Sequence, residues 1–360
     1  MLLLNNQEIE GLLDMQTCLD ALETGYRDLL EGGAGYRGRI DFHMPCDYPE
    51  GYFRWGTMEG ASNKLGVFAI RMKSDILTWP DGKTEEKHCI EPGTFCGLIF
   101  LVSTRNGEPL AIMNDGILQH MRVGACAGLG TKYLARQDAT TVGMLGSGGM
   151  ARTYLRSFHA VRPIRKVKVY SPTKEHREAY AKEMSEMLEI EVTPVDSAQE
   201  ASRGVDIFAT ATDSLLPTMK AEWLEPGVHF TDVSGSKETD PATYDKADVI
   251  LQLGQGTLDE ASPDFDFRRP VASIYVGTEE QLSVIPRANY KERRDYPHLI
   301  DLWAGKDPGR TSDEQITFFR NSGTQGLQFA AVGGAVYKLA RERGVGRELP
   351  TEWFTQNIRD

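Results

Sequence analysis

A glycine-rich hexapeptide is the clearest chemical signal in the sequence. It reads Gly146-Ser147-Gly148-Gly149-Met150-Ala151 and follows the apolar run of residues 140–145. The first glycine permits a tight turn out of a strand, the second lets the backbone approach a pyrophosphate, and the small Ala151 lets the next helix pack on the sheet. The free N–H groups at that helix start favour phosphate. The hexapeptide therefore predicts a dinucleotide site, with an ordinary glycine-rich turn as the alternative.

The next strand-like run ends at Tyr170, where residue types distinguish two nucleotides. An NAD site usually has an acid here for the ribose 2′-hydroxyl. This chain instead carries hydroxyl and cationic side chains, namely Ser171, Thr173, Lys174 and Arg177. These side chains suit a 2′-phosphate, so we predict that NADP(H) is favoured over NAD(H). The alternative is that Lys174 and Arg177 are solvated helix charges.

Two cationic residues outside this region could hold and protonate a small acid. Lys73 ends the apolar run of residues 66–73, and Arg122 lies in a run rich in small residues, 117–135. Arginine binds a carboxylate through two parallel hydrogen bonds, and burial can tune the pKa of a lysine for proton transfer. The alternatives are a strand-end surface charge for Lys73 and a domain-interface ion pair for Arg122.

The pattern of apolar residues changes near residue 139. Before it, helical spacing over 7–31 precedes strand-like runs at 66–73 and 97–103 with a hairpin turn at Asn106-Gly107, and 36–62 indicates loops and short strands. After it, strands alternate with helices, which predicts a parallel doubly wound sheet. The expected strands are 140–145, 166–170, 191–195, 206–211, 229–233 and 249–251, and a last amphipathic helix spans 326–343.

Composition narrows the functional class. The 360 residues are 40% hydrophobic and 26% charged, which predicts a folded protein of two domains. The net charge of −12 argues against nucleic-acid binding. Five cysteines without metal-ligand spacing favour a reduced, cytoplasmic protein with no metal site. The first residues do not resemble a signal peptide, and the apolar runs are too short to cross a membrane.

Several segments resemble the ornithine cyclodeaminase/mu-crystallin family. They are Met121–Ala125, Lys132–Ala139, Asp206–Thr212, Trp223–His229 and Gly309–Phe319. The resemblance implies an α/β fold with a Rossmann doubly wound sheet plus a discontinuous α+β domain for substrate binding and dimerisation. We place the Rossmann domain at 126–309 and the second domain at 1–125 and 310–360. The resemblance also implies a homodimer whose sheets pair, acting on a small amino, imino or oxo acid.

The same resemblance assigns roles to individual residues. Lys73 matches an active-site lysine, Arg122 matches a carboxylate-binding arginine, and Thr94 matches a threonine near the nicotinamide. Arg39 is our choice for a second carboxylate ligand, with Arg37 and Arg54 as alternatives. The further cofactor contacts expected are Thr210, Thr212, Ser234, Ser322 and Gly323.

One departure from the family is informative. The cyclodeaminases carry a catalytic aspartate where this chain has Ser236, and a serine hydroxyl is no base near neutral pH unless it is activated. We therefore predict an NAD(P)-dependent imine reductase or amino-acid dehydrogenase acting at the α-carbon, with Asp232 as a candidate replacement for the missing acid. Ornithine cyclodeaminase and a non-catalytic NADP-binding protein are the alternatives.

Overall fold

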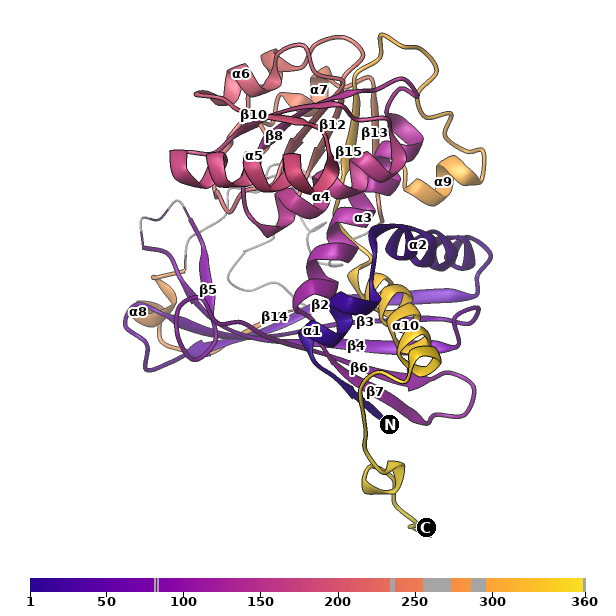
Figure 1. The fold of residues 1–360 in the computed structure, drawn as a ribbon. Helices are drawn as coiled ribbons and strands as arrows, with labels where there is room; N and C mark the ends of the chain where they lie inside the picture. The colour runs from indigo at the N-terminus through magenta and orange to yellow at the C-terminus, as the bar shows by residue number, and fades with distance from the viewer. Residues whose placement is uncertain (81, 83, 234–236, 255–272, 286–295, 359–360) are drawn as a thin grey trace.

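Two sheets organise the chain, with a long helix running between them (Figure 1). The structure is a computed structural model that describes residues 1–360 except 81, 83, 234–236, 255–272, 286–295 and 359–360. No helix in the described part of the chain combines the length and the apolar character needed to span a membrane.

The upper sheet is parallel throughout and has seven strands in the order β10-β9-β8-β11-β12-β15-β13. Helices cover it on both sides, so its central strands β11, β12 and β15 are buried at every position. This confirms the predicted doubly wound α/β fold. The strands are β8 (Thr141–Leu145), β9 (Lys166–Tyr170), β10 (Glu191–Pro194), β11 (Ile207–Thr210), β12 (His229–Asp232), β13 (Val249–Gln252) and β15 (Thr317–Arg320). The helices of this part are α4 (Gly149–Val161), α5 (Lys174–Leu188), α6 (Ala198–Ser202), α7 (Thr243–Lys246) and α9 (Leu299–Trp303).

The lower sheet is mostly antiparallel and runs β14-β2-β3-β4-β6-β7-β1-β16, with β5 paired to β4. Its strands are β1 (Leu2–Leu4), β2 (Ala34–Pro45), β3 (Tyr52–Ser62), β4 (Val67–Thr78), β5 (Glu86–His88), β6 (Cys96–Ser103), β7 (Pro109–Asn114), β14 (Ser273–Tyr275) and β16 (Arg347–Glu348). The predicted hairpin turn at Asn106-Gly107 joins β6 to β7, where Gly107 N–H bonds to the Ser103 carbonyl. The prediction of loops and short strands over 36–62 was wrong, because this segment forms the long strands β2 and β3.

The glycines that suggested loops serve close packing instead. A Cβ on Gly60 would lie 2.3 Å from the backbone nitrogen of Leu327 in α10 (Gln325–Arg343). On Gly56 it would lie 2.4 Å from a carboxylate oxygen of Asp41. Both positions are inside a strand and face the covered side of the sheet, so glycine there admits a neighbour rather than breaking the strand.

In the described parts of the chain, helices cover one face of the lower sheet. Along β3, buried residues alternate with half-buried or exposed ones, and the buried set faces α10 and its neighbours. The single helix expected over 7–31 is two helices, α1 (Asn6–Leu12) and α2 (Met15–Leu30). They are separate because Asp14 caps α2, where its carboxylate accepts a hydrogen bond of 2.7 Å from the Thr17 N–H.

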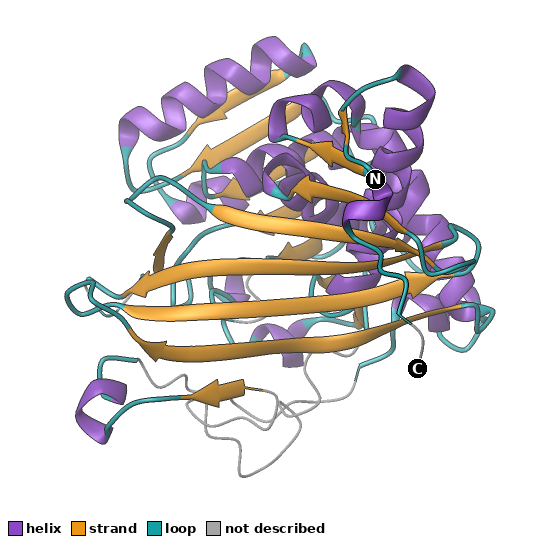
Figure 2. Cartoon of the chain, turned by 90° about the horizontal axis from the view of Figure 1, so that it is seen from below, coloured by secondary structure: helices purple, strands orange, loops and turns teal. Residues whose placement is uncertain are grey.

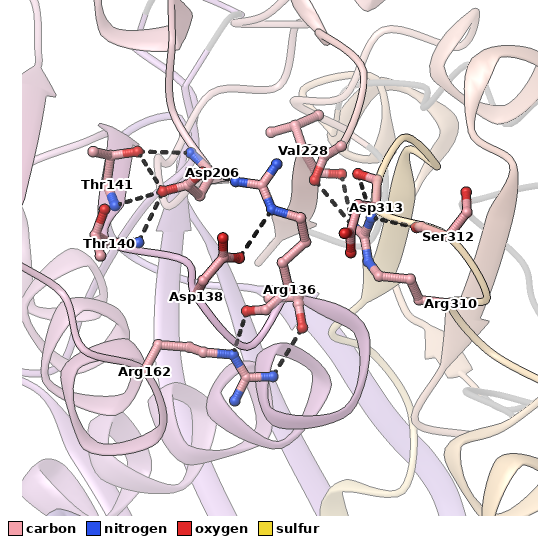
Figure 3. A network of polar contacts seen from close by, with 12 residues as sticks. Arg136, Asp138, Thr140, Thr141, Arg162, Asp206, Val228, Arg310, Ser312 and Asp313 are labelled. Carbon is pink, nitrogen blue, oxygen red and sulfur yellow. Dashed lines mark hydrogen bonds and ion pairs between the residues drawn. The ribbon is translucent and has the colours of Figure 1, made fainter.

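The connector α3 (Gly116–Leu134) joins the two parts, and its small residues allow close contact, as predicted. A Cβ on Gly124 would lie 2.6 Å from the backbone of Thr153 in α4. The C-terminal carbonyls of the helix are bound by Arg162, which donates to Lys132 O at 2.7 Å and Ala135 O at 2.9 Å. Figure 3 shows this guanidinium directed at the helix end, beside the network of Arg136 and Asp206. The connector is therefore anchored to the part of the chain that carries the upper sheet.

The chain crosses between the two sheets more often than the expected division at residue 309 allows. The β15 strand lies between β12 and β13 in the upper sheet, although 310–360 was assigned to the other domain. Conversely, β14 pairs with β2 in the lower sheet and leads into α8 (Glu279–Leu282). The sheets thus divide the chain differently from that prediction. Strands that pair over a long sequence separation cannot be recognised from the local spacing of apolar residues.

Candidate active site

The hexapeptide turn has the geometry that a dinucleotide requires. Gly146 has φ +104°, and a Cβ there would lie 2.3 Å from the carbonyl oxygen of Ala211. Gly148 and Gly149 are exposed at the start of α4, and a Cβ on Gly148 would meet nothing within 4 Å. Ala151 is fully buried against the sheet. The backbone N–H groups of an open helix end therefore fit a pyrophosphate here.

The sides of this turn are fixed by side chains. Ser147 and Met150 are half-buried, and the Ser147 hydroxyl donates to Ser171 Oγ at 2.9 Å. Arg152 donates to the Ser147 carbonyl at 2.5 Å and to the Glu183 carboxylate at 2.9 Å. Side chains of α4 and of the segment after β9 thus hold the turn in shape.

The residues after β9 divide into two kinds. Arg177 is buried, donates to the Ser171 carbonyl at 3.0 Å and pairs with Asp196 at 2.6 Å, so it shapes the turn. Thr173 and Lys174 are exposed, and the ammonium of Lys174 lies 3.7 Å from the Glu178 carboxylate. Lys174 is therefore the accessible cation beside the strand end.

The other expected cofactor residues lie at strand ends and turns. Thr210 is fully buried at the end of β11, and its hydroxyl has no hydrogen-bond partner among the described residues. Two residues on, the N–H and hydroxyl of Thr212 donate to Glu238 at 2.9 and 2.5 Å. Thr94 is half-buried in the turn after β5.

The turn after β15 contains Ser322 and Gly323. Gly323 has φ +91°, and its carbonyl accepts a hydrogen bond from Gln328 at 2.9 Å. Ser322 is half-buried beside it. Ser234 and Ser236 lie outside the described residues.

A charged group lies on the covered face of the lower sheet. Arg71, Lys73 and Asp75 occupy alternate positions of β4 and so share one face. Lys73 stands inside the strand rather than at its end, because β4 continues to Thr78. The ammonium of Lys73 lies 3.0 Å from one Asp75 oxygen, and Arg54 donates to the other at 2.6 Å. Burial lowers the pKa of Lys73 to about 7, against the opposing pull of Asp75.

The three candidate arginines are in different surroundings. Arg37 is exposed and pairs with Glu59, which removes it from this group. Arg39 is half-buried and pairs with Asp41 at 2.7 Å, and one of its terminal nitrogens has no partner among the described residues. Arg54 is buried against Asp75. Arg39 and Arg54 both stay candidates for a substrate ligand.

Arg122 is a buried cation with amide partners. Its side chain donates to Gln119 at 2.8 Å and also to Gln328, and the guanidinium lies 4.7 Å from the centre of the Phe329 ring. Burial lowers its pKa to about 10. Within the described parts of the chain it forms no ion pair with a carboxylate, whereas Arg71 pairs with Asp115 at 2.7 Å. A buried guanidinium without an anion is poised to bind one.

Sequence reasoning missed a bridge between the two parts. Thr84, which precedes β5, pairs with Ser214 in the loop after β11. Although burial alone would raise it, the pKa of Glu85 is held well below its usual range by Lys87 and Lys237, which belong to the two different parts. No local pattern marks these residues. Asp75 was also missed, although period-two alternation would have placed it beside Lys73 had the strand been extended.

Asp232, the proposed replacement acid, ends β12. Its carboxylate is fully buried and accepts a hydrogen bond of 2.8 Å from Thr239, and its carbonyl accepts one of 3.0 Å from Tyr154. These contacts hold the Asp232 side chain in a buried position at the carboxyl end of β12. Its role in proton transfer stays a prediction.

Known proteins are similar to this chain over almost its whole length. The chain is 29% identical to the alanine dehydrogenase of Archaeoglobus fulgidus over 356 residues, 97% of this chain and 98% of that protein. A Thermococcus litoralis Δ1-pyrroline-2-carboxylate reductase, solved with NADH and L-proline, is 27% identical with a TM-score of 0.74, covering 97% of this chain and 100% of that one. An archaeal alanine dehydrogenase dimer with bound NAD is 26% identical with a TM-score of 0.73, covering 97% and 99%.

The family relationship agrees with the fold, the glycine turn and the buried cations. The family model described as "Ornithine cyclodeaminase/mu-crystallin family" matches residues 1–343. This chain belongs to the ornithine cyclodeaminase/mu-crystallin family.

Proposed function

We propose that this chain is an NAD(P)-dependent imine reductase or amino-acid dehydrogenase that works at the α-carbon of a small amino or imino acid. The observation that carries the proposal is a pair of cations on the inner side of the lower sheet, the half-buried Lys73 with a pKa near 7 and the buried Arg122, which has no carboxylate partner within the described residues. The relatives named alanine dehydrogenase and pyrroline-2-carboxylate reductase support it. The bound nicotinamide supplies or accepts the hydride.

The residues of the site would act mainly by binding and by moving one proton. Arg122 would hold the substrate carboxylate through its guanidinium fork, with Arg39 or Arg54 as the second ligand. Lys73 would donate a proton to the imine nitrogen during reduction and accept one from the amine during oxidation. A pKa near 7 makes both forms of Lys73 available near neutral pH.

The finer choice of nucleotide rests on the end of β9. We propose that NADP(H) is preferred, because exposed Thr173 and Lys174 stand where an acid would bind the 2′-hydroxyl of NAD(H). Arg177 contributes indirectly through its bonds to the turn.

We also propose that the chain is a homodimer, as in the archaeal alanine dehydrogenase dimer. Figure 2 shows the lower sheet from below, with most helices of the described residues behind it. Many side chains that point to this outer face are apolar, and they are half-buried or exposed. An antiparallel sheet with one face in water normally carries polar side chains on that face. An outer face rich in apolar side chains therefore favours contact with a partner. The apolar outward residues are Phe42, Met44, Phe53, Trp55, Ile70, Met72, Leu98 and Phe100, and the polar side chains of Thr57, Glu59 and Ser74 share this face.

The test is oxidation of NADPH and NADH against a panel of substrates. The panel contains 2-oxo acids with ammonia or methylamine, and the cyclic imines pyrroline-2-carboxylate and piperideine-2-carboxylate. Oxidation that requires both the carbonyl or imine and the carboxylate supports the proposal. Conversion of ornithine to proline and ammonium without net change in NAD(P)H would replace it with cyclodeamination, and nucleotide binding without turnover of any substrate would refute it.

A further inference from the structure

The last described segment of the chain, residues 349–358, stands apart from the rest of the molecule. After α10 and β16 the chain runs past the lower sheet and ends below it, on the side away from the helices (Figure 1). We refer to residues 349–358 as the arm. The arm also lies beyond residues 1–343, which the family model matches.

The start of the arm is firmly placed. Strand β16 pairs with β1 at the edge of the lower sheet, with Leu2 opposite Glu348. Leu349 N–H then donates to the Met1 carbonyl at 2.8 Å, and a short 3-10 turn, Thr351–Trp353, follows Pro350. The direction in which the arm leaves the sheet is therefore set by backbone hydrogen bonds.

The remainder of the arm is exposed and carries three large apolar side chains among polar ones. Trp353, Phe354 and Ile358 are 70%, 45% and 68% exposed, and every residue from 352 to 358 is exposed. Aromatic side chains of this size bury 150–250 Å² when they are packed. Two aromatic side chains and one isoleucine exposed within six residues, on a segment with a fixed start, favour contact with another protein surface.

We propose that the arm packs on a second copy of this chain, so that the two arms of a symmetric dimer are exchanged across it. The arm projects on the same side as the uncovered apolar face of the lower sheet, which includes Trp55 and Leu98. A two-fold contact through that face brings the partner to the side where the arm projects, and symmetry then engages both arms. The inference rests on the homodimer proposed above and adds a segment to its interface.

The primary test is the dimer dissociation constant, measured by analytical ultracentrifugation over a dilution series. The variant is W353S with F354S, and the matched control is M187S, which removes a side chain that is 51% exposed on α5. Because each dimer loses two arms, we expect the double variant to weaken dimerisation at least about 100-fold and the control to leave it within about twofold. Equal dissociation constants for the double variant and the unaltered chain would overturn the proposal.

A second measurement locates the arm directly. Phe354 is replaced by photoreactive benzoylphenylalanine, and the irradiated protein is digested and analysed by mass spectrometry. Crosslinks between mixed isotopically labelled and unlabelled chains support exchange, whereas crosslinks within one chain alone contradict it. A chain that is monomeric at all concentrations would refute the homodimer as well, while a stable dimer that does not depend on the arm would refute only this inference. Turnover of the imine panel tests the proposed activity separately.

Discussion

The glycine turn after β8 and the covered face of β4 are built on opposite principles. The turn offers backbone N–H groups, and its key residues are defined by what they lack: Gly146 has no Cβ to strike Ala211, and Gly148 leaves open space. The face of β4 offers three charged side chains, the buried Arg71 and Asp75 and the half-buried Lys73, whose properties depend on their neighbours. The first site therefore depends on shape and the second on charge balance.

This difference predicts different failures. A substitution in the turn adds atoms where none fit, and it affects the backbone and nucleotide binding together. A substitution on the charged face changes protonation or leaves an ion without its partner, so its effect on stability depends on which member of a pair is removed. The same physical distinction separates Arg122, which has amide partners, from Arg71, which has a carboxylate partner.

Removal of Lys73 tests the charged face most directly. We expect Lys73→Met to lower kcat/KM about 10³-fold, since a positioned proton donor contributes 10²–10⁴-fold. In the unaltered chain, kcat/KM for reduction should be level below pH 7 and fall above it, and kcat/KM for oxidation should rise through the same pH, because the pKa of Lys73 is about 7. The measurement is the pH profile of kcat/KM in both directions.

Two further results sharpen this prediction. Asp75 raises the pKa of Lys73, so Asp75→Asn should move both pH profiles to lower pH. The control Asp41→Asn disturbs the pair with Arg39 instead, and it should move the profiles less.

The stability of the chain should also depend on this group. Between pH 7 and 10.5 the unfolded chain holds a proton that folded Lys73 has released, so this group makes stability rise with pH. Lys73→Met should abolish that contribution. A profile unchanged in Asp75→Asn would contradict the role given to Lys73.

Arg122 and Arg71 form the next comparison. Arg122→Met should lower kcat/KM about 10²-fold through a higher KM, with a smaller loss of stability than Arg71→Met, because the buried guanidinium bonds to amides and has no carboxylate partner within the described residues. Arg71→Met should lower stability by about 3–5 kcal/mol, since it leaves the Asp115 carboxylate buried and unpaired. Urea unfolding and steady-state kinetics measure the two effects. Equal destabilisation by both variants would show that the proposed charge balance is wrong.

The two regions also differ in how far the sequence predicts them. The glycine turn, the parallel strands and the small-residue connector follow rules that act over a few residues, and they are found where predicted. The charged face depends on strand register. Gly56 and Gly60 suggested loops, yet each admits a neighbouring group that belongs to another strand or to α10.

Strand length and long-range pairing explain the remaining errors. Lys73 was placed at a strand end because Ser74 and Asp75 interrupt the apolar run, although an ion pair makes burial of Asp75 favourable. The strands β14 and β15 were assigned to the wrong parts because their partners lie far away in sequence. Glu85 contacts the upper part only through the fold itself.

The glycine turn offers a comparison of two neighbouring positions. Gly146→Ala should weaken nucleotide binding several tens-fold and lower thermal stability, because its Cβ would meet Ala211 O and its φ is +104°. Gly148→Ala should weaken nucleotide binding by a comparable factor without changing the stability of the nucleotide-free chain, since its Cβ meets no protein atom. Nucleotide titration by fluorescence and thermal unfolding without nucleotide separate the two. Tight binding by Gly148→Ala would exclude pyrophosphate contact there.

The smallest effect concerns the choice of nucleotide. Lys174 is exposed at the start of α5, so its attraction for a 2′-phosphate is screened by solvent and worth about 1 kcal/mol, or fivefold. Lys174→Gln should therefore raise the KM for NADPH about fivefold and leave that for NADH unchanged. Lys182→Gln on the same helix is the matched control, and it should change neither value.

Arg177 gives a contrasting result. Because Arg177 holds the turn through the Ser171 carbonyl, Arg177→Gln should weaken the binding of both NADH and NADPH. Equal values of kcat/KM for NADH and NADPH in the unaltered chain would refute the preference.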